Sequence, residues 1–291
     1  MPGDSLPPTL AVVVLGLASS GIWGLSDFVA GVATKRAPLF GVMAVSQLIG
    51  VLIALPLITI HGEPLMPTSD VTWSIVSGVL GVTGLGFLYH GLSSGRMGVV
   101  APVAGILVAG IPVAFGFAIQ GAPPPIVMAG IGIAIASVAT IARAPAGEGA
   151  PSSGLGWGLA AGITLGLLAV AISRLDPGFV FTPLAVLRTT ETIICLVVIV
   201  ATRRAWRIPR ELWPATLAVG VLDMSGTATY LVAIQTGPLA IAAVLSALYP
   251  ATTVLLAAGV LRERLSPSHV LGLLAAGVGV VLIAGGQAFA G

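Results

Sequence analysis

The sequence predicts an all-α membrane protein in which ten transmembrane helices form two inverted repeats of five. The composition, the apolar runs and an internal repeat support this prediction. Of the 291 residues, 57% are hydrophobic and only 8% are charged, and the mean hydropathy is +1.10. A soluble domain normally has about 25% charged residues. Lipid must therefore be the solvent for most of the surface.

Ten apolar runs are long enough to cross a bilayer, which takes roughly 20 apolar residues. Because lipid cannot satisfy backbone polar groups, runs of this length form helices. Their apolar character is continuous, whereas the strands of a membrane β-barrel alternate apolar and polar residues. Turn signals such as Asp176-Pro177-Gly178 separate them. The predicted spans are 9–31, 37–60, 71–93, 97–119, 125–143, 154–174, 181–202, 212–235, 238–260 and 267–288.

The two halves of the chain are related to each other. The polar linker 144–153 separates a first repeat, 9–143, from a second repeat, 154–288. A constant shift of 142 residues superposes similar positions over more than 50 residues. The matched pairs include Gly78 with Gly220, Gly84 with Gly226, Gly95 with Gly237, Pro125 with Pro267 and Gly130 with Gly272. Since each half has five helices, the second enters the membrane inverted, as in many secondary transporters, whose sites lie between the repeats.

Four ionisable residues stand out inside predicted spans, because a charge near the bilayer centre costs at least about 2.5–3.5 kcal/mol. Arg188 and Glu191 are three residues apart and share a helix face. They form either a self-neutralising ion pair or part of a site in which Arg188 binds a carboxylate. Asp223 has no cation near it in the sequence, which favours a functional role over a hydrogen bond to a neighbouring helix. Asp27 lies nearer the interface, and both interpretations stay open for it.

Two aromatic residues accompany these charges. Trp23 is one turn from Asp27, and Tyr230 is two turns from Asp223. Aromatic residues in membrane helices often serve packing or interface roles, so this alternative stays open. We expect the substrate-binding residues to be Trp23, Asp27, Arg188, Glu191, Asp223 and Tyr230. The expected pocket lies between the halves, on the first, third, sixth and eighth helices and parts of the seventh and ninth.

Short motifs make the sequence resemble the drug/metabolite transporter superfamily, in particular its ten-helix EamA-type members. The first motif is Gly21-Ile22-Trp23-Gly24, and the second is the run from Pro183 to Arg188. The third is Leu248-Tyr249-Pro250, followed by Leu261-Arg262-Glu263-Arg264-Leu265 and then by Gly272 and Gly277. The resemblance covers nearly the whole chain. It implies a transporter of small metabolites, often an exporter, with a central cavity. The first half departs from the pattern, with Gly121 opposite Glu263 and Met43 opposite Arg188.

The leading functional prediction is a secondary transporter, an exporter or exchanger of amino-acid-like or drug-like solutes, with protons as a candidate coupling ion. No P-loop, HExxH or paired CxxC motif occurs, which argues against an ATP-driven pump and a zinc enzyme. We expect no catalytic residue, cofactor, metal or nucleic-acid partner. An intramembrane or lipid-modifying enzyme and a non-transporting scaffold are the alternatives. The expected location is the plasma (inner) membrane, as a monomer or homodimer.

Two further expectations concern orientation and coupling. Ten of the 12 basic residues follow odd-numbered helices, so the positive-inside rule places both termini outside. The family resemblance implies cytoplasmic termini instead. For coupling, a carboxylate in a low-dielectric site can bind and release protons near neutral pH. Asp223 is the first candidate and Glu191 the second, because Arg188 favours the ionised form of Glu191.

Overall fold

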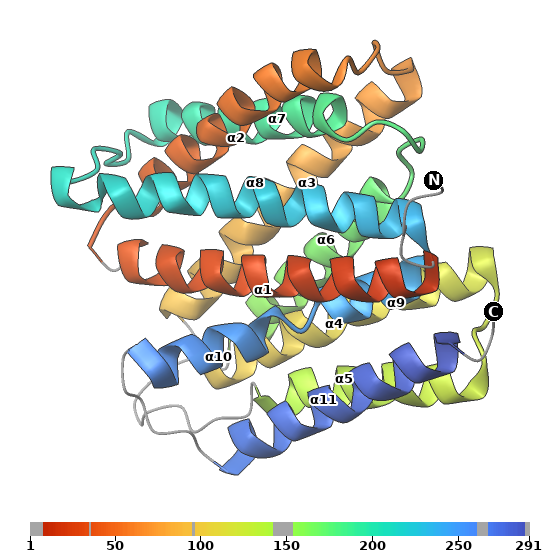
Figure 1. The fold of residues 1–291 in the computed structure, drawn as a ribbon. Helices are drawn as coiled ribbons and strands as arrows, with labels where there is room; N and C mark the ends of the chain where they lie inside the picture. Colours follow the sequence, from red (N-terminus) through yellow and green to blue (C-terminus); the bar gives the residue numbers. More distant parts are fainter. Residues whose placement is uncertain (1–7, 35, 95–96, 142–153, 261–266, 289–291) are drawn as a thin grey trace.

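A computed structural model describes residues 8–34, 36–94, 97–141, 154–260 and 267–288, which form helices joined by short loops (Figure 1). The first half contains α1 (Pro8–Thr34), α2 (Leu39–His61), α3 (Thr68–Ser94), α4 (Met97–Gln120) and α5 (Pro125–Ile141). The second half contains α6 (Leu155–Ile172), α7 (Phe181–Thr202), the 3₁₀ turn η1 (Arg210–Leu212), α8 (Trp213–Thr236), α9 (Leu239–Ser246), α10 (Tyr249–Val260) and α11 (Pro267–Ala288).

The ninth predicted span, 238–260, differs from the structure. The sequence predicts one helix there, but the structure has α9 and α10, separated at Ala247 and Leu248. The sequence places Pro250 just after the break, and proline lacks the N–H that a continuous helix would bond to residue 246. The other nine predicted spans each coincide with one helix, and their ends differ from the helix ends by at most three residues.

The outer surface of the bundle is apolar, as lipid requires. Within the described residues, six helices are long and apolar enough to cross a membrane, and shorter apolar helices cover 104–120, 125–140 and 270–286. Large hydrophobic side chains point outward along them, including Val200 and Val281, which are 75% and 68% exposed. Soluble monomers rarely expose contiguous apolar surface of this extent. The chain is therefore a multi-pass membrane protein.

The helices of the two halves interleave rather than form separate bundles (Figure 1). Helix α1 packs against α8, α3 packs against α6, α2 packs against α7, and α5 packs against α11. Small residues allow these close approaches: a Cβ on Gly84 would lie 2.6 Å from Leu165 Cδ2, and one on Gly130 would lie 2.9 Å from the Gly279 carbonyl oxygen. Glycine therefore serves helix packing here, as the membrane setting predicts.

One end of the bundle carries basic residues. We call it the basic end; its described residues include Arg36 and the loop 203–212. This loop is fixed to the start of α2, because the Arg204 guanidinium lies 5.6 Å from the Phe40 ring centre and the Trp206 backbone contacts Gly41. Five basic residues counted for the orientation, Lys35, Arg96, Arg143, Arg262 and Arg264, lie outside the described residues.

The opposite end ties the two halves together through polar contacts. Glu63, just after α2, accepts hydrogen bonds from the backbone N–H groups of Val180, Phe181 and Thr182, at 2.7–3.0 Å, and one from the Thr182 hydroxyl. Partial burial raises the pKa of Glu63, but these N–H donors at the start of α7 outweigh it and hold the pKa below its ordinary value. Asp70 also accepts a hydrogen bond from the Asp176 N–H at 3.1 Å. We call these contacts the interhalf latch.

Candidate functional site

A cavity of about 130 Å³ lies inside the bundle, between the two halves. Residues of α1, α3, α4, α6, α7, α8 and α9 line it, together with Ala247 and with Tyr249 of α10. The pocket expected from the sequence did not include the fourth helix, which contributes Val108. All six residues expected to bind substrate line this cavity: Trp23, Asp27, Arg188, Glu191, Asp223 and Tyr230.

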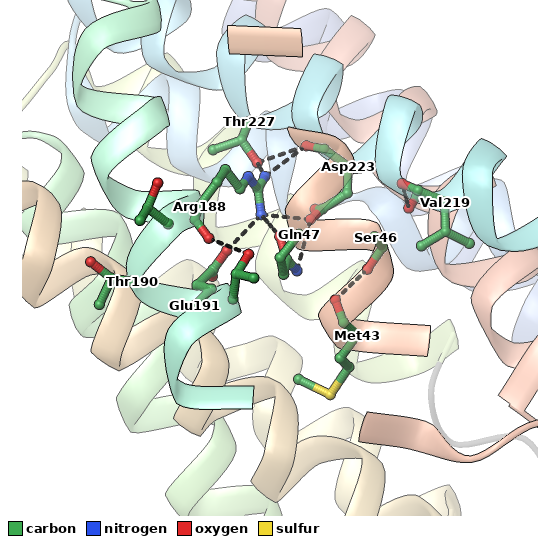
Figure 2. A network of polar contacts seen from close by, with 12 residues as sticks. Met43, Ser46, Gln47, Arg188, Thr190, Glu191, Val219, Asp223 and Thr227 are labelled. Atoms are coloured by element: carbon green, nitrogen blue, oxygen red, sulfur yellow. Dashed lines mark hydrogen bonds and ion pairs between the residues drawn. The ribbon is translucent and has the colours of Figure 1, made fainter. Parts of the chain in front are cut away.

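Arg188 is the centre of a buried polar network (Figure 2). Its Nη1 donates to Gln47 Oε1 at 2.6 Å, Asp223 Oδ2 at 2.7 Å and Glu191 Oε2 at 2.9 Å. Its Nη2 donates to the Asp223 carbonyl oxygen at 3.0 Å and the Thr227 hydroxyl at 2.6 Å. One guanidinium therefore joins helices α2, α7 and α8 and is neutralised by two carboxylates.

Glycines on two neighbouring helices make room for this network. A Cβ on Gly50 of α2 would lie 3.0 Å from Arg188 Cγ and 3.4 Å from Arg188 Nε. A Cβ on Gly81 of α3 would collide with Glu191 Oε1. The Arg188 side chain therefore packs against the α2 backbone at Gly50, and the Glu191 carboxylate packs against the α3 backbone at Gly81.

The structure corrects the premise used for Asp223. The sequence shows no cation near Asp223, but Arg188 Nη1 forms an ion pair with it at 2.7 Å, shorter than the 2.9 Å pair with Glu191. The partners are 35 positions apart in the sequence, so no local pattern reveals this pair. Asp223 thus shares the cation of Arg188 with Glu191, so the contrast between the two carboxylates does not hold.

Asp27 differs from the other two carboxylates. Within the part of the chain that the structure describes, it forms no ion pair or hydrogen bond through its side chain. It lines the main cavity and also a second cavity of about 40 Å³ between α1, α2, α3 and α8. Thr34 and Leu39, at the basic end, line this second cavity. Asp27, Leu85 and Asp223 line both cavities and therefore lie between them.

Two aromatic rings form an apolar wall of the main cavity. The ring centres of Trp23 and Tyr230 are 5.4 Å apart, and the Trp23 ring lies against Gly226, where a Cβ would be 2.5 Å from its Cδ1. Tyr230 is 2% exposed, and its hydroxyl has no hydrogen-bond partner in the structure. Tyr230 lines the main cavity, and its hydroxyl is buried.

Sequence reasoning missed several polar residues at the site. Gln47 and Thr227 bind Arg188, and Ser246 lines the cavity while donating to the Gly16 carbonyl oxygen at 3.3 Å. Gln47 carried a usable signal, because it is the single amide in the span 37–60. Thr227 did not, since a threonine that bonds to the carbonyl four residues earlier is common in membrane helices.

Comparisons with known proteins agree with this fold. A solved crystal structure is similar over 93% of this chain and 95% of its own, with a TM-score of 0.78 and 17% identity. An uncharacterized protein of Methanocaldococcus jannaschii is 27% identical over 95 residues, which is 32% of this chain and 69% of that protein. Residues 152–285 match the EamA-like transporter family. The resemblance inferred from the sequence is thereby confirmed, and the chain carries an EamA-like transporter region over residues 152–285.

Proposed function

We propose that the protein is a secondary transporter that moves a small organic solute through the cavity between its halves. One observation carries the proposal: a buried ionic network of Arg188, Glu191 and Asp223 lines a cavity at the contact of the halves. Ionisable residues inside the membrane are costly and normally mark a substrate or ion pathway. The family match over residues 152–285 supports a transport role.

The two halves act as inverted repeats in this proposal, with boundaries at 9–143 and 154–288. Helix contacts support it, because exchanging α1 with α6, α2 with α7, α3 with α8 and α5 with α11 reproduces the main packing pairs. Helix α1 packs on α8 as α6 packs on α3, while α2–α7 and α5–α11 map onto themselves. Alternating access would then rock one group of helices against the other around the cavity.

The side from which the main cavity opens is inferred from a comparison of the two ends of the bundle. At one end, the interhalf latch joins Glu63 and the first turn of α3 to the loop before α7 and the first turn of α7. The second cavity reaches from Asp27 and Asp223 to Thr34 at the basic end. The described conformation is therefore the one in which the basic end is the nearer to opening. The excess of basic residues supports a cytoplasmic location for this end, and we propose the plasma membrane as its location.

Coupling to a proton gradient is a separate part of the proposal. Arg188 pairs with both Asp223 and Glu191, so protonation of either carboxylate would break a buried ion pair. Asp27 is therefore the better candidate for proton exchange, in place of Asp223. An exchanger without protons is the alternative, and the same assay separates the two.

The test is solute counterflow into proteoliposomes that contain the purified protein. Vesicles are loaded with one unlabelled metabolite mixture, and entry of each labelled solute is measured with and without a proton gradient. The proposal expects saturable entry of at least one solute that requires the protein. If no solute of a broad panel enters above protein-free vesicles, the protein is not a transporter of this kind, and the enzyme and scaffold alternatives gain weight.

A further inference from the structure

The charges of the cavity define the kind of solute that fits it, on the basis of the proposed transport function. Among the described residues that line the cavity, Arg188 is the one cation, and Asp27, Glu191 and Asp223 are anionic when ionised. The lining therefore carries an excess of negative charge. A solute that brings a positive charge reduces this excess, whereas a carboxylate increases it.

Arg188 offers a solute carboxylate no unengaged terminal N–H group. Both of its terminal nitrogens are engaged, Nη1 by three acceptors and Nη2 by two. Its Nε has no partner but lies beside Gly50 of α2, where a Cβ would be 3.4 Å away, and Gly50 does not line the cavity. A solute carboxylate would have to displace Glu191 or Asp223 from a buried ion pair.

Asp27 offers the complementary group. Its carboxylate lines the cavity without an ion pair or hydrogen bond to any described residue. Trp23 is one turn away on the same helix face, and its ring packs against Tyr230. The faces of aromatic rings attract cations. Tyr230 lines the same cavity.

The size of the cavity limits the apolar part of the solute. Its volume is about 130 Å³, and a buried apolar cavity of about 150 Å³ accepts benzene. Leucine, isoleucine and valine side chains, including Leu168, Ile172 and Val108, form much of its wall. The cavity thus suits one aromatic ring or a short branched chain.

We propose that the protein transports small protonated amines with an apolar body, bound through Asp27, and discriminates against the corresponding amino acids and carboxylates. The ammonium group pairs with Asp27, while the ring or branched chain lies against Trp23 and Tyr230. An amino acid of the same shape is excluded because its carboxylate finds no free cation. The buried Arg188 network shapes the cavity and does not bind the solute carboxylate.

Two matched series test this selectivity. The first is phenethylamine, phenylalanine and 3-phenylpropanoate; the second is isoamylamine, leucine and 4-methylpentanoate. Equilibrium binding to the purified protein and counterflow into proteoliposomes are measured for each compound at neutral pH. The amine of each series should bind and exchange, while its amino acid and its carboxylate should compete at least about tenfold more weakly.

Variants then locate the ammonium group. Asp27→Asn should lower amine affinity at least about tenfold, since it removes a charge partner from a desolvated site, and Asp27→Glu should retain part of it. Glu211→Gln makes the corresponding change from carboxylate to amide at an exposed position outside the cavity and should leave binding unchanged. Gel filtration and thermal unfolding show whether each variant is folded.

The outcomes separate the two proposals. If an amino acid or a carboxylate exchanges as well as its amine, the amine selectivity is refuted while transport stands. If Asp27→Asn binds amines like the parent, Asp27 does not hold the ammonium group. If neither amine binds or exchanges, the substrate class is wrong, and the broad metabolite panel decides independently whether the protein transports any solute.

Discussion

Removal of the Arg188 charge tests whether the buried network is held together by that one cation. In Arg188→Met, the carboxylates of Glu191 and Asp223 lose a partner at 2.9 and 2.7 Å. Glu191 is only 2% exposed, so water cannot replace the guanidinium there. Loss of one partner from a buried ion pair typically costs about 3–5 kcal/mol. We expect a loss of this size in the free energy of unfolding.

The assay is unfolding of the purified protein in a mild detergent, followed by circular dichroism and tryptophan fluorescence. The triple variant Arg188→Met, Glu191→Gln and Asp223→Asn should recover much of the lost stability, because no uncompensated charge remains buried. Arg174→Met, at an exposed position, serves as the control and should match the parent. The reasoning fails if Arg188→Met is as stable as the parent, or if the triple variant is no more stable than the single one.

Three more predictions concern packing, the latch and orientation. In unfolding measurements, Gly81→Ala should destabilise the protein by about 1–3 kcal/mol, because the added Cβ would collide with Glu191. The control is Gly86→Ala on the same helix, where the added Cβ meets nothing within 4 Å, so this variant should be neutral or stabilising. Glu63→Gln should cost about 1 kcal/mol at neutral pH, as for other losses at helix starts. The pKa of Glu63 is lowered from 4.5 in the folded protein, so the difference in unfolding free energy between the variant and the parent should have its full size above pH 4.5. This difference should shrink as the pH falls through the lowered pKa of Glu63. A constant difference in unfolding free energy down to pH 3 would contradict the latch. A reporter fused after Gly291 should give the signal of the non-cytoplasmic side, and a cytoplasmic signal would reverse the proposed orientation.

Most of the helices could be predicted because bilayer thickness fixes the length of an apolar run. The spans over α2 and α7 begin and end within two residues of the prediction, since proline, glycine or charged residues border them. The break between α9 and α10 was not predicted, because the surrounding residues are apolar on both sides. The only local signal is Pro250, and proline inside membrane helices is often tolerated without a break.

The site was predictable only where its residues are close in the sequence. The pair of Arg188 and Glu191 follows from helix periodicity, and the structure places its ions 2.9 Å apart. The pairing of Arg188 with Asp223 and Gln47 depends on how α2, α7 and α8 pack, which no local pattern specifies. Asp27 could be named from the sequence as an ionisable residue. That it has no ion pair or hydrogen bond among the described residues became visible only once the tertiary contacts showed that Arg188 pairs with Glu191 and Asp223.

The most direct test of the central claim measures access to the cavity from each side of the membrane. Cys195 is the only cysteine and is buried, so a Cys195→Ala background allows single labelling sites. Ala243→Cys places a thiol in the cavity wall, and Val197→Cys, which is 59% exposed on the outer face of α7, provides a lipid-facing control. Membrane-impermeant thiol reagents should label Ala243→Cys from both sides, with solute shifting the balance between them, and should label the control from neither. Labelling of Ala243→Cys from one side alone under every condition would contradict alternating access.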